Sequence, residues 1–320
     1  MLHLLTSQMT SHFHDTIQHA AAAFYNKAVA LAAPRISETT RTTGIAATLA
    51  VYWHLLSLDA PTVAALWCWS FARVAHVDLP RFAPLLLAVG TWLVYVADRI
   101  LDGMDSANLA RLRERHYFYL QHRRSFLTAG AMVVPVFAWV VFTRMSPAVR
   151  LEDAAVFAVA ALYFLLVHTH GHAAERWLPK ELAVGVLFAM ATAVPAWARA
   201  AGGRFALAPV VAVFAALCWL NCVAIESWES PAVGASAHRT TAWAARHLQG
   251  LTFAMLVVSL ILSSANLHDS VRFYLLLASA MSALLLFWLA HSSKHLTALQ
   301  LRIAADAALL TPLLFVAWMR

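Results

Sequence analysis

The sequence predicts an all-α protein, a polytopic membrane bundle of about nine transmembrane helices with its N-terminus in the cytoplasm. Hydrophobic residues make up 62% of the 320 residues and charged residues only 12%, about half of the roughly 25% charged content of soluble domains. Apolar runs of about 20 residues, the length that crosses a bilayer, recur along the chain. Lys and Arg gather in alternate loops, and the positive-inside rule then places the N-terminus inside.

The basic charge of the chain does not indicate a nucleic-acid partner. The net charge is +7, but basic residues in short loops between apolar spans set topology and contact anionic lipid. The three cysteines lie within apolar segments and are interpreted as buried small hydrophobic residues. No cleavable signal peptide is expected, and we expect a bacterial-type inner (plasma) membrane.

Two regions are expected along the chain. Residues 1–42 form an N-terminal cytoplasmic or interfacial segment, whose helix-prone part at 16–33 either lies on the membrane surface or is a loose tail. Residues 43–320 form the transmembrane domain. Its predicted helices cover 44–74, 81–101, 125–144, 152–168, 181–199, 206–226, 247–265, 271–290 and 300–318.

The first predicted helix contains Asp59 and Pro61, which interrupt its apolar sequence. Proline removes a backbone hydrogen bond and clashes with the preceding turn, so we expect the helix to bend there. A separate short span at 44–57 would instead give ten helices and invert all later ones. The charge bias favours nine helices, with the loop after Asp105 in the cytoplasm.

Three aspartates stand at the end of the second predicted helix, within LVYVADRILDGMDSANLARLRERHYFYLQHRR. At 100° per residue, Asp102 lies about 40° round the helix from Asp98, and Asp105 about 20° the other way. Carboxylates on one face repel one another, so we expect a cation among them. Mg²⁺, which binds a few carboxylates together with substrate phosphates, is the natural candidate. Simple charge pairs at a helix end are the alternative.

Other polar residues gather at the same predicted membrane face. The sixth predicted helix ends in WLNCVAIESWES, with Glu226 and Glu229 about 60° apart; plain cytoplasmic cap residues are the alternative. Arg302 and Asp306 are interpreted as an intrahelical ion pair. The alternating histidines of VHTHGH are interpreted as a solvated loop rather than a metal site, and they are His168, His170 and His172.

These motifs resemble those of the UbiA-type intramembrane prenyltransferases, and the resemblance covers roughly residues 50–318. The family's first motif reads N-D-x-x-D-x-x-x-D, whereas here Ala97 precedes a D-x-x-x-D-x-x-D pattern. Its second motif, D-x-x-x-D or a close variant, corresponds to NCVAIESWE, which contains no aspartate. The PKELAVG segment resembles the stretch that carries a diphosphate-binding lysine.

The resemblance implies a Mg²⁺-dependent transferase that moves an allylic prenyl group from isoprenyl diphosphate to a lipophilic acceptor. Its implied catalytic and metal-binding residues are Asp98, Asp102, Asp105, Glu226 and Glu229. Its implied substrate-binding residues are Arg99, Arg115, Arg123, Arg124, Lys180, Asn221 and Tyr95.

Two alternatives from other classes follow from the same residues. The first is a catalytically silent UbiA-like protein that binds a lipid or quinone, favoured by the weak second motif. The second is a transporter, whose ionisable residues are expected nearer mid-span than these. A CDP-alcohol phosphotransferase is rejected, because six residues instead of two separate Asp102-Gly103 from Ala110-Arg111.

Overall fold

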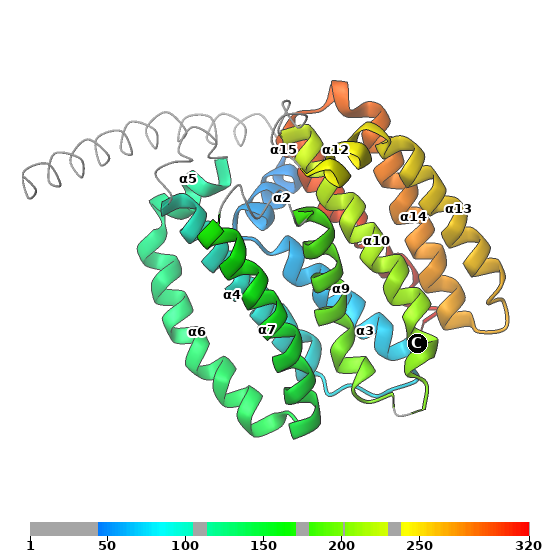
Figure 1. The fold of residues 1–320 in the computed structure, drawn as a ribbon, viewed down its shortest axis with the longest axis horizontal. Coiled ribbons are helices and arrows are strands. Elements are labelled where there is room, and N and C mark those ends of the chain that lie inside the picture. Colours follow the sequence, from blue (N-terminus) through cyan, green and yellow to red (C-terminus); the bar gives the residue numbers. More distant parts are fainter. Residues whose placement is uncertain (1–43, 105–113, 171–178, 201, 230–237, 320) are drawn as a thin grey trace, which may run out of the picture. The chain divides into compact units, whose positions relative to one another are not determined.

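The computed structural model describes residues 44–104, 114–170, 179–200, 202–229 and 238–319, and the side chains within them except at 102–104, 114–116 and 163–170. This described part is helical and contains no strand (Figure 1). Five of its helices are long and apolar enough to cross a membrane, or up to seven spans form if α2–α3 and α12–α13 each count as one broken span. The all-α prediction is confirmed. Nine spans and a cytoplasmic N-terminus stay predictions, and the segment 1–42 lies outside the described residues.

The chain divides into two compact units, each described by itself. The first unit is 1–58 with 92–136, and the second is 59–91 with 137–320. The described elements of the first unit are α2 (Ile45–Leu55), the later part of α4 (Phe82–Met104), α5 (Glu114–Gln121) and the earlier part of α6 (Arg123–Arg144).

A small aromatic core holds the first unit together. The rings of Tyr119 and Phe126 stack with centroids 4.1 Å apart, and Val96 and Ile100 of α4 complete the cluster. The basic sequence after Asp105 therefore includes a packed helix, α5, where the sequence indicated only a loop.

The predicted interruption before Pro61 is observed. Helix α2 ends at Leu55, and Ser57 takes a left-handed conformation with φ 53°. Helix α3 (Asp59–Val74) then starts at Asp59. Pro61 lies in the first turn of α3, where its missing N–H breaks no helical hydrogen bond. The proline therefore opens a new helix and does not kink a continuous one.

The second unit is built around α10 (Figure 1). Helix α10 contacts α3, α9, α12, α13, α14 and α15. The elements of this unit besides α3, the earlier part of α4 and the later part of α6 are α7 (Pro147–His170), α9 (Lys180–Trp197), α10 (Arg204–Glu229), α12 (Arg239–Arg246), α13 (Leu248–Ser264), α14 (Ser270–Ser292), η2 (Ser293–His295), α15 (Ala298–Ala308) and η3 (Thr311–Phe315).

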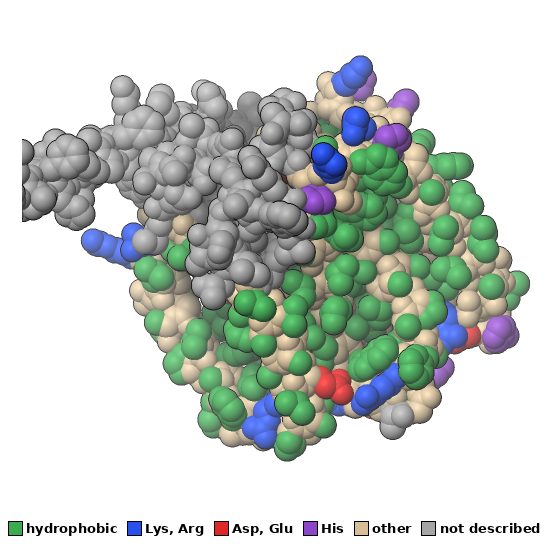
Figure 2. Space-filling model, viewed as in Figure 1, with side chains coloured by type: hydrophobic (Ala, Val, Ile, Leu, Met, Phe, Trp, Pro, Cys, Tyr) green, Lys and Arg blue, Asp and Glu red, His purple; other side chains and the backbone are tan. Residues whose placement is uncertain are grey.

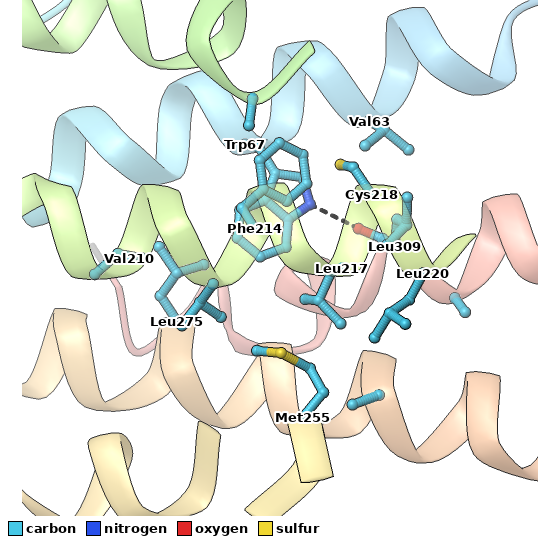
Figure 3. Packing of buried hydrophobic residues seen from close by; sticks show 14 of the residues in the cluster. Val63, Trp67, Val210, Phe214, Leu217, Cys218, Leu220, Met255, Leu275 and Leu309 are labelled. Carbon is cyan, nitrogen blue, oxygen red and sulfur yellow. Dashed lines mark hydrogen bonds between the residues drawn. The ribbon is translucent and has the colours of Figure 1, made fainter. Parts of the chain in front are cut away.

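Stacked aromatic side chains fix α3 against α10 (Figure 3). Trp67 and Phe214 are fully buried, and their ring centroids are 4.0 Å apart at 18°. The Trp67 Nε1–H donates to the carbonyl oxygen of Leu309 over 2.8 Å. This bond satisfies the indole donor in an apolar core and joins α3 to the end of α15.

Helices α9 and α10 cross closely at Gly185. A Cβ atom at this position would lie 2.7 Å from the backbone nitrogen of Trp219. Small residues permit such approach of helix backbones in membrane bundles. Gly185 therefore sets the distance between these two helices.

The predicted helix 300–318 is not continuous. Helix α15 ends at Ala308, and the shorter η3 follows. The hydroxyl of Thr311 donates to the carbonyl oxygen of Ala278 in α14 over 2.7 Å, and Leu309 accepts from Trp67. Bonds to neighbouring helices thus replace helical bonds at the break. The short helix α12, joined to α13 at an 80° bend, was not predicted.

The surface of the second unit agrees with a membrane environment. Phe205, Ile261 and Trp288 are exposed apolar side chains on α10, α13 and α14. In Figure 2, hydrophobic side chains cover most of the described face, and Lys, Arg and His gather toward its ends. This distribution is typical of helices that face lipid along their length.

Candidate functional site

The structure places Asp98, Arg99 and Tyr95 together near the end of α4. Asp98 is half-buried, whereas Arg99 is only 3% exposed. The Arg99 Nε–H donates to Ser57 Oγ over 2.8 Å. The guanidinium carbon of Arg99 lies 5.7 Å from the centre of the Tyr95 ring, within cation–π range. A buried cation, a carboxylate and an aromatic face thus share one helix end.

Several predicted site residues lie outside the described residues or side chains. Arg123 and Arg124 are described, and both are exposed in the first turn of α6. They are therefore open to an anionic ligand. Asp102 lies in α4, Arg115 in α5, and His168 and His170 in α7, but their side chains are not described, and Asp105 and His172 lie outside the described residues. The two histidines in α7 thus belong to a helix, where the sequence indicated a loop.

The acidic end of α10 is joined to α15 by an ion pair. Arg302 Nη1 donates to both carboxylate oxygens of Glu229, over 2.9 Å and 3.0 Å. The side chains of Arg302 and Glu229 are 12% and 10% exposed. A carboxylate at a helix C-terminus is disfavoured by the helix dipole, and Arg302 offsets this cost. Arg302 thus links two helices, beyond the intrahelical role that the sequence indicated. Glu226, one turn earlier, is half-buried.

Asn221 lies deeper in the second unit and meets a different partner. It is 5% exposed, about 12 Å inside the C-terminal end of α10 at 1.5 Å per residue. Its Nδ2 donates to Asp306 Oδ1 of α15 over 3.1 Å. The carboxylate oxygens of Asp306 and Asp59 lie within 4.8 Å of each other, and Asp59 is 3% exposed. We call Asp59, Asn221 and Asp306 the buried oxygen cluster.

Lys180 and its neighbour occupy the start of α9. Lys180 is exposed in the first helical turn. The next carboxylate, Glu181, accepts a hydrogen bond from the buried hydroxyl of Thr241 in α12. Lys180 is therefore at a helix N-terminus, where its ammonium group and the free backbone N–H groups can both bind an anion.

Sequence reasoning gave no functional role to Asp59 and assigned Asp306 to a local ion pair. Each is a carboxylate inside an otherwise apolar stretch, VYWHLLSLDAP for Asp59 and LRIAADAALL for Asp306. An ionisable residue at membrane depth is a functional candidate by default. That signal was present at both positions, but their meeting depends on the packing of α3 and α15.

The predicted residues thus fall into separate groups. Asp98, Arg99 and Tyr95 belong to the first unit, and Asn221, Glu226, Glu229 and Lys180 to the second. No protein-family model, curated protein or solved structure matches the chain. The resemblance to UbiA-type prenyltransferases therefore rests on the motif residues themselves.

Proposed function

We propose that this protein is a membrane-embedded, Mg²⁺-dependent prenyltransferase that moves an allylic prenyl group from isoprenyl diphosphate to a lipophilic acceptor. The proposal rests on the side chains at the end of α4. Half-buried Asp98 stands there beside the buried guanidinium of Arg99, in a helix apolar enough to cross a membrane. A carboxylate with a fixed cation suits a substrate that has a charged head and an apolar chain.

The ligands that we propose near the end of α4 are carboxylate oxygens, which suit a hard cation such as Mg²⁺. Asp98 supplies carboxylate oxygen, and the proposal adds Asp102 and Asp105 from the same predicted motif. When bound, Mg²⁺ would neutralise diphosphate oxygens and so stabilise the leaving group. Glu226 and Glu229 are the proposed second acidic group. Because both oxygens of Glu229 accept from Arg302, this ion pair must open before Glu229 can ligate a metal.

The positive side chains would hold the diphosphate. Arg99 is held by its Nε bond to Ser57 and is thereby oriented before the ligand arrives. Exposed Arg123 and Arg124 of the same unit are the further proposed contacts, and Lys180 is a separate proposed anion contact in the second unit. Guanidinium groups bind phosphate oxygens in a bidentate manner, which fixes orientation as well as adding affinity.

The reaction breaks the C1–O bond of the allylic diphosphate, and the diphosphate leaves with the bonding electron pair. The acceptor then bonds to C1 and releases a proton to solvent. The allylic carbocation between these events needs a water-poor aromatic environment. Tyr95 already faces one cation, the guanidinium of Arg99, and its ring would stabilise the carbocation in the same way.

One observation favours a second candidate, a UbiA-like membrane protein that binds a lipid or quinone without turnover. The ion pair between Arg302 Nη1 and both oxygens of Glu229 neutralises one carboxylate of the second acidic motif. A protein that had lost the need for a second metal could keep this pair as a structural link between α10 and α15.

Diphosphate release separates the two candidates. Purified protein in lipid nanodiscs is incubated with Mg²⁺ and a radiolabelled allylic diphosphate, with a mixed lipid extract as acceptor. We expect release that depends on Mg²⁺, reduced about 10²–10³-fold in Asp98→Asn, the range found when one electrostatic stabiliser is removed. Asp78→Asn, which removes an exposed carboxylate between α3 and α4, is the matched control. Binding without release in the wild type would support the silent protein.

A further inference from the structure

The short helix α12 lies across one end of the second unit (Figure 1). It meets α13 at an 80° bend, and α13 packs along α14, which is long and apolar enough to cross a membrane. Helix α14 ends at the same end of the unit where α13 begins. Because α12 is nearly perpendicular to α13, it lies along the membrane surface when α13 and α14 cross the bilayer.

The inner side of α12 is fixed to the rest of the unit. Thr241 and Ala244 are fully buried, and Ala244 belongs to the main hydrophobic core. The Thr241 hydroxyl donates to a carboxylate oxygen of Glu181 in α9. His238 caps the helix, since its Nδ1 accepts from the backbone N–H of Thr240. These contacts hold the helix in one orientation, so its opposite side faces outward.

The outer side of α12 combines cations with an aromatic ring. Arg239, Trp243 and Arg246 are exposed and lie within about 60° of one another at 100° per residue. We call these three residues the basic–aromatic face of α12. Figure 2 shows Lys, Arg and His side chains gathered at this end of the described surface. A tryptophan beside cations at the end of a helix bundle is typical of the level of the lipid headgroups.

The charge around the basic–aromatic face is positive. The only acidic residue between 238 and 305 is Asp269, in the turn between α13 and α14. Neither Arg239 nor Arg246 is in an ion pair with another described residue. The Arg246 Nε–H donates to the carbonyl oxygen of Ala242 over 3.2 Å, which orients the guanidinium. Exposed Lys294 in η2, which follows α14, adds a further cation.

The carboxylates of the helices beneath α12 are engaged elsewhere or set inward. Glu181 of α9 meets the inner side of α12 through Thr241. On α10, Glu229 accepts from Arg302, and Glu226 is half-buried. The outward-facing guanidinium groups therefore suit an anionic ligand that approaches from the membrane surface.

We propose that the basic–aromatic face of α12 binds the headgroups of anionic phospholipids in the leaflet around this end of the bundle. Arg239 and Arg246 donate to phosphate oxygens, and Trp243 lies at the level of the headgroups. The proposal does not rest on the transferase activity proposed above, because α12 contains none of the residues assigned to that reaction.

Lipid binding by the full-length protein tests the proposal. Protein purified in a neutral detergent is titrated with radiolabelled phosphatidylglycerol, and bound lipid is counted after size-exclusion chromatography. We expect saturable binding that neither phosphatidylcholine nor inorganic phosphate displaces. Arg239→Gln with Arg246→Gln should weaken binding about thirtyfold, the effect of two basic residues near an anionic lipid surface.

Two further variants separate the face of α12 from net charge and from misfolding. Arg81→Gln with Arg144→Gln removes the same charge at exposed positions elsewhere in the second unit and should bind nearly as the wild type does. Arg239→Lys with Arg246→Lys keeps the charge and should retain most of the binding. Equal losses in the two glutamine variants would overturn the proposal, as would unchanged binding in the α12 glutamine variant or displacement by inorganic phosphate. A wild type that binds no phosphatidylglycerol would overturn it too.

Discussion

The acidic end of α4, at Asp98, and the buried oxygen cluster both place charged side chains in an apolar helix bundle, but they differ in how deeply those side chains are buried. Asp98 is half-buried near a helix end, and its predicted partner Asp102 follows in the same helix. Asp59 and Asn221 are 3% and 5% exposed and come from different helices. Charge at a helix end is near water and inexpensive, whereas charge in the core needs a compensating partner. The buried oxygen cluster therefore depends more on the correct packing of the helices than Asp98 does.

The largest expected effect concerns the ion pair between Arg302 and Glu229 in the second unit. Arg302→Met leaves Glu229, which is 10% exposed, without the guanidinium that neutralises it. We expect a loss of about 3–5 kcal/mol in the free energy of unfolding, as when one partner of a buried pair is removed. Thermal unfolding in detergent measures it.

A double variant gives the matched control for this ion pair. Arg302→Met with Glu229→Met removes both charges of the pair, and we expect near-neutral stability because neither member is left without the other. If the single variant is as stable as the wild type, the end of α10 is as well hydrated as an ordinary helix end.

A smaller effect is expected at the crossing of α9 and α10. Gly185→Ala places a Cβ atom 2.7 Å from the Trp219 nitrogen, so a helix must shift. Overpacking of this kind costs about 1–3 kcal/mol. Thermal unfolding in detergent measures the loss. Gly250→Ala, where an added Cβ meets nothing within 4 Å, is the control.

The smallest effect is expected at the surface. Arg204 and Glu152 make a contact of 3.4 Å, with side chains 41% and 31% exposed. Exposed ion pairs contribute roughly 0–1 kcal/mol. Glu152→Gln should therefore leave the melting temperature almost unchanged. A large fall in the melting temperature would mean that the burial of a charged pair does not determine how much the pair contributes to the stability of this protein.

The sequence located most long helices because their apolar runs are local signals. The predicted helix 125–144 matches α6 (Arg123–Arg144), and 206–226 lies within α10 (Arg204–Glu229). The last predicted span was wrong, because hydropathy does not register that Leu309 and Thr311 bond to other helices. The amphipathic α12 was missed because eight residues with two arginines resemble a loop.

The candidate sites divide in the same way. The Asp98 group could be predicted because its members are spaced along one helix. The link between Asn221 and Asp306 spans 85 residues, and no spacing rule connects them. The bond between Arg302 and Glu229 likewise depends on how α15 packs on α10. Long-range pairing of polar groups follows from the packed core, which a single sequence does not reveal.

In the proposed function, the acidic end of α4 supports Mg²⁺-dependent cleavage of an allylic diphosphate. Diphosphate release by the wild type, Asp98→Asn and Asp306→Asn in nanodiscs tests it most directly. We expect release by the wild type, its loss in Asp98→Asn, and release by Asp306→Asn once that protein is shown to be folded. Absence of Mg²⁺-dependent release in the wild type, or full release by Asp98→Asn, would contradict the claim.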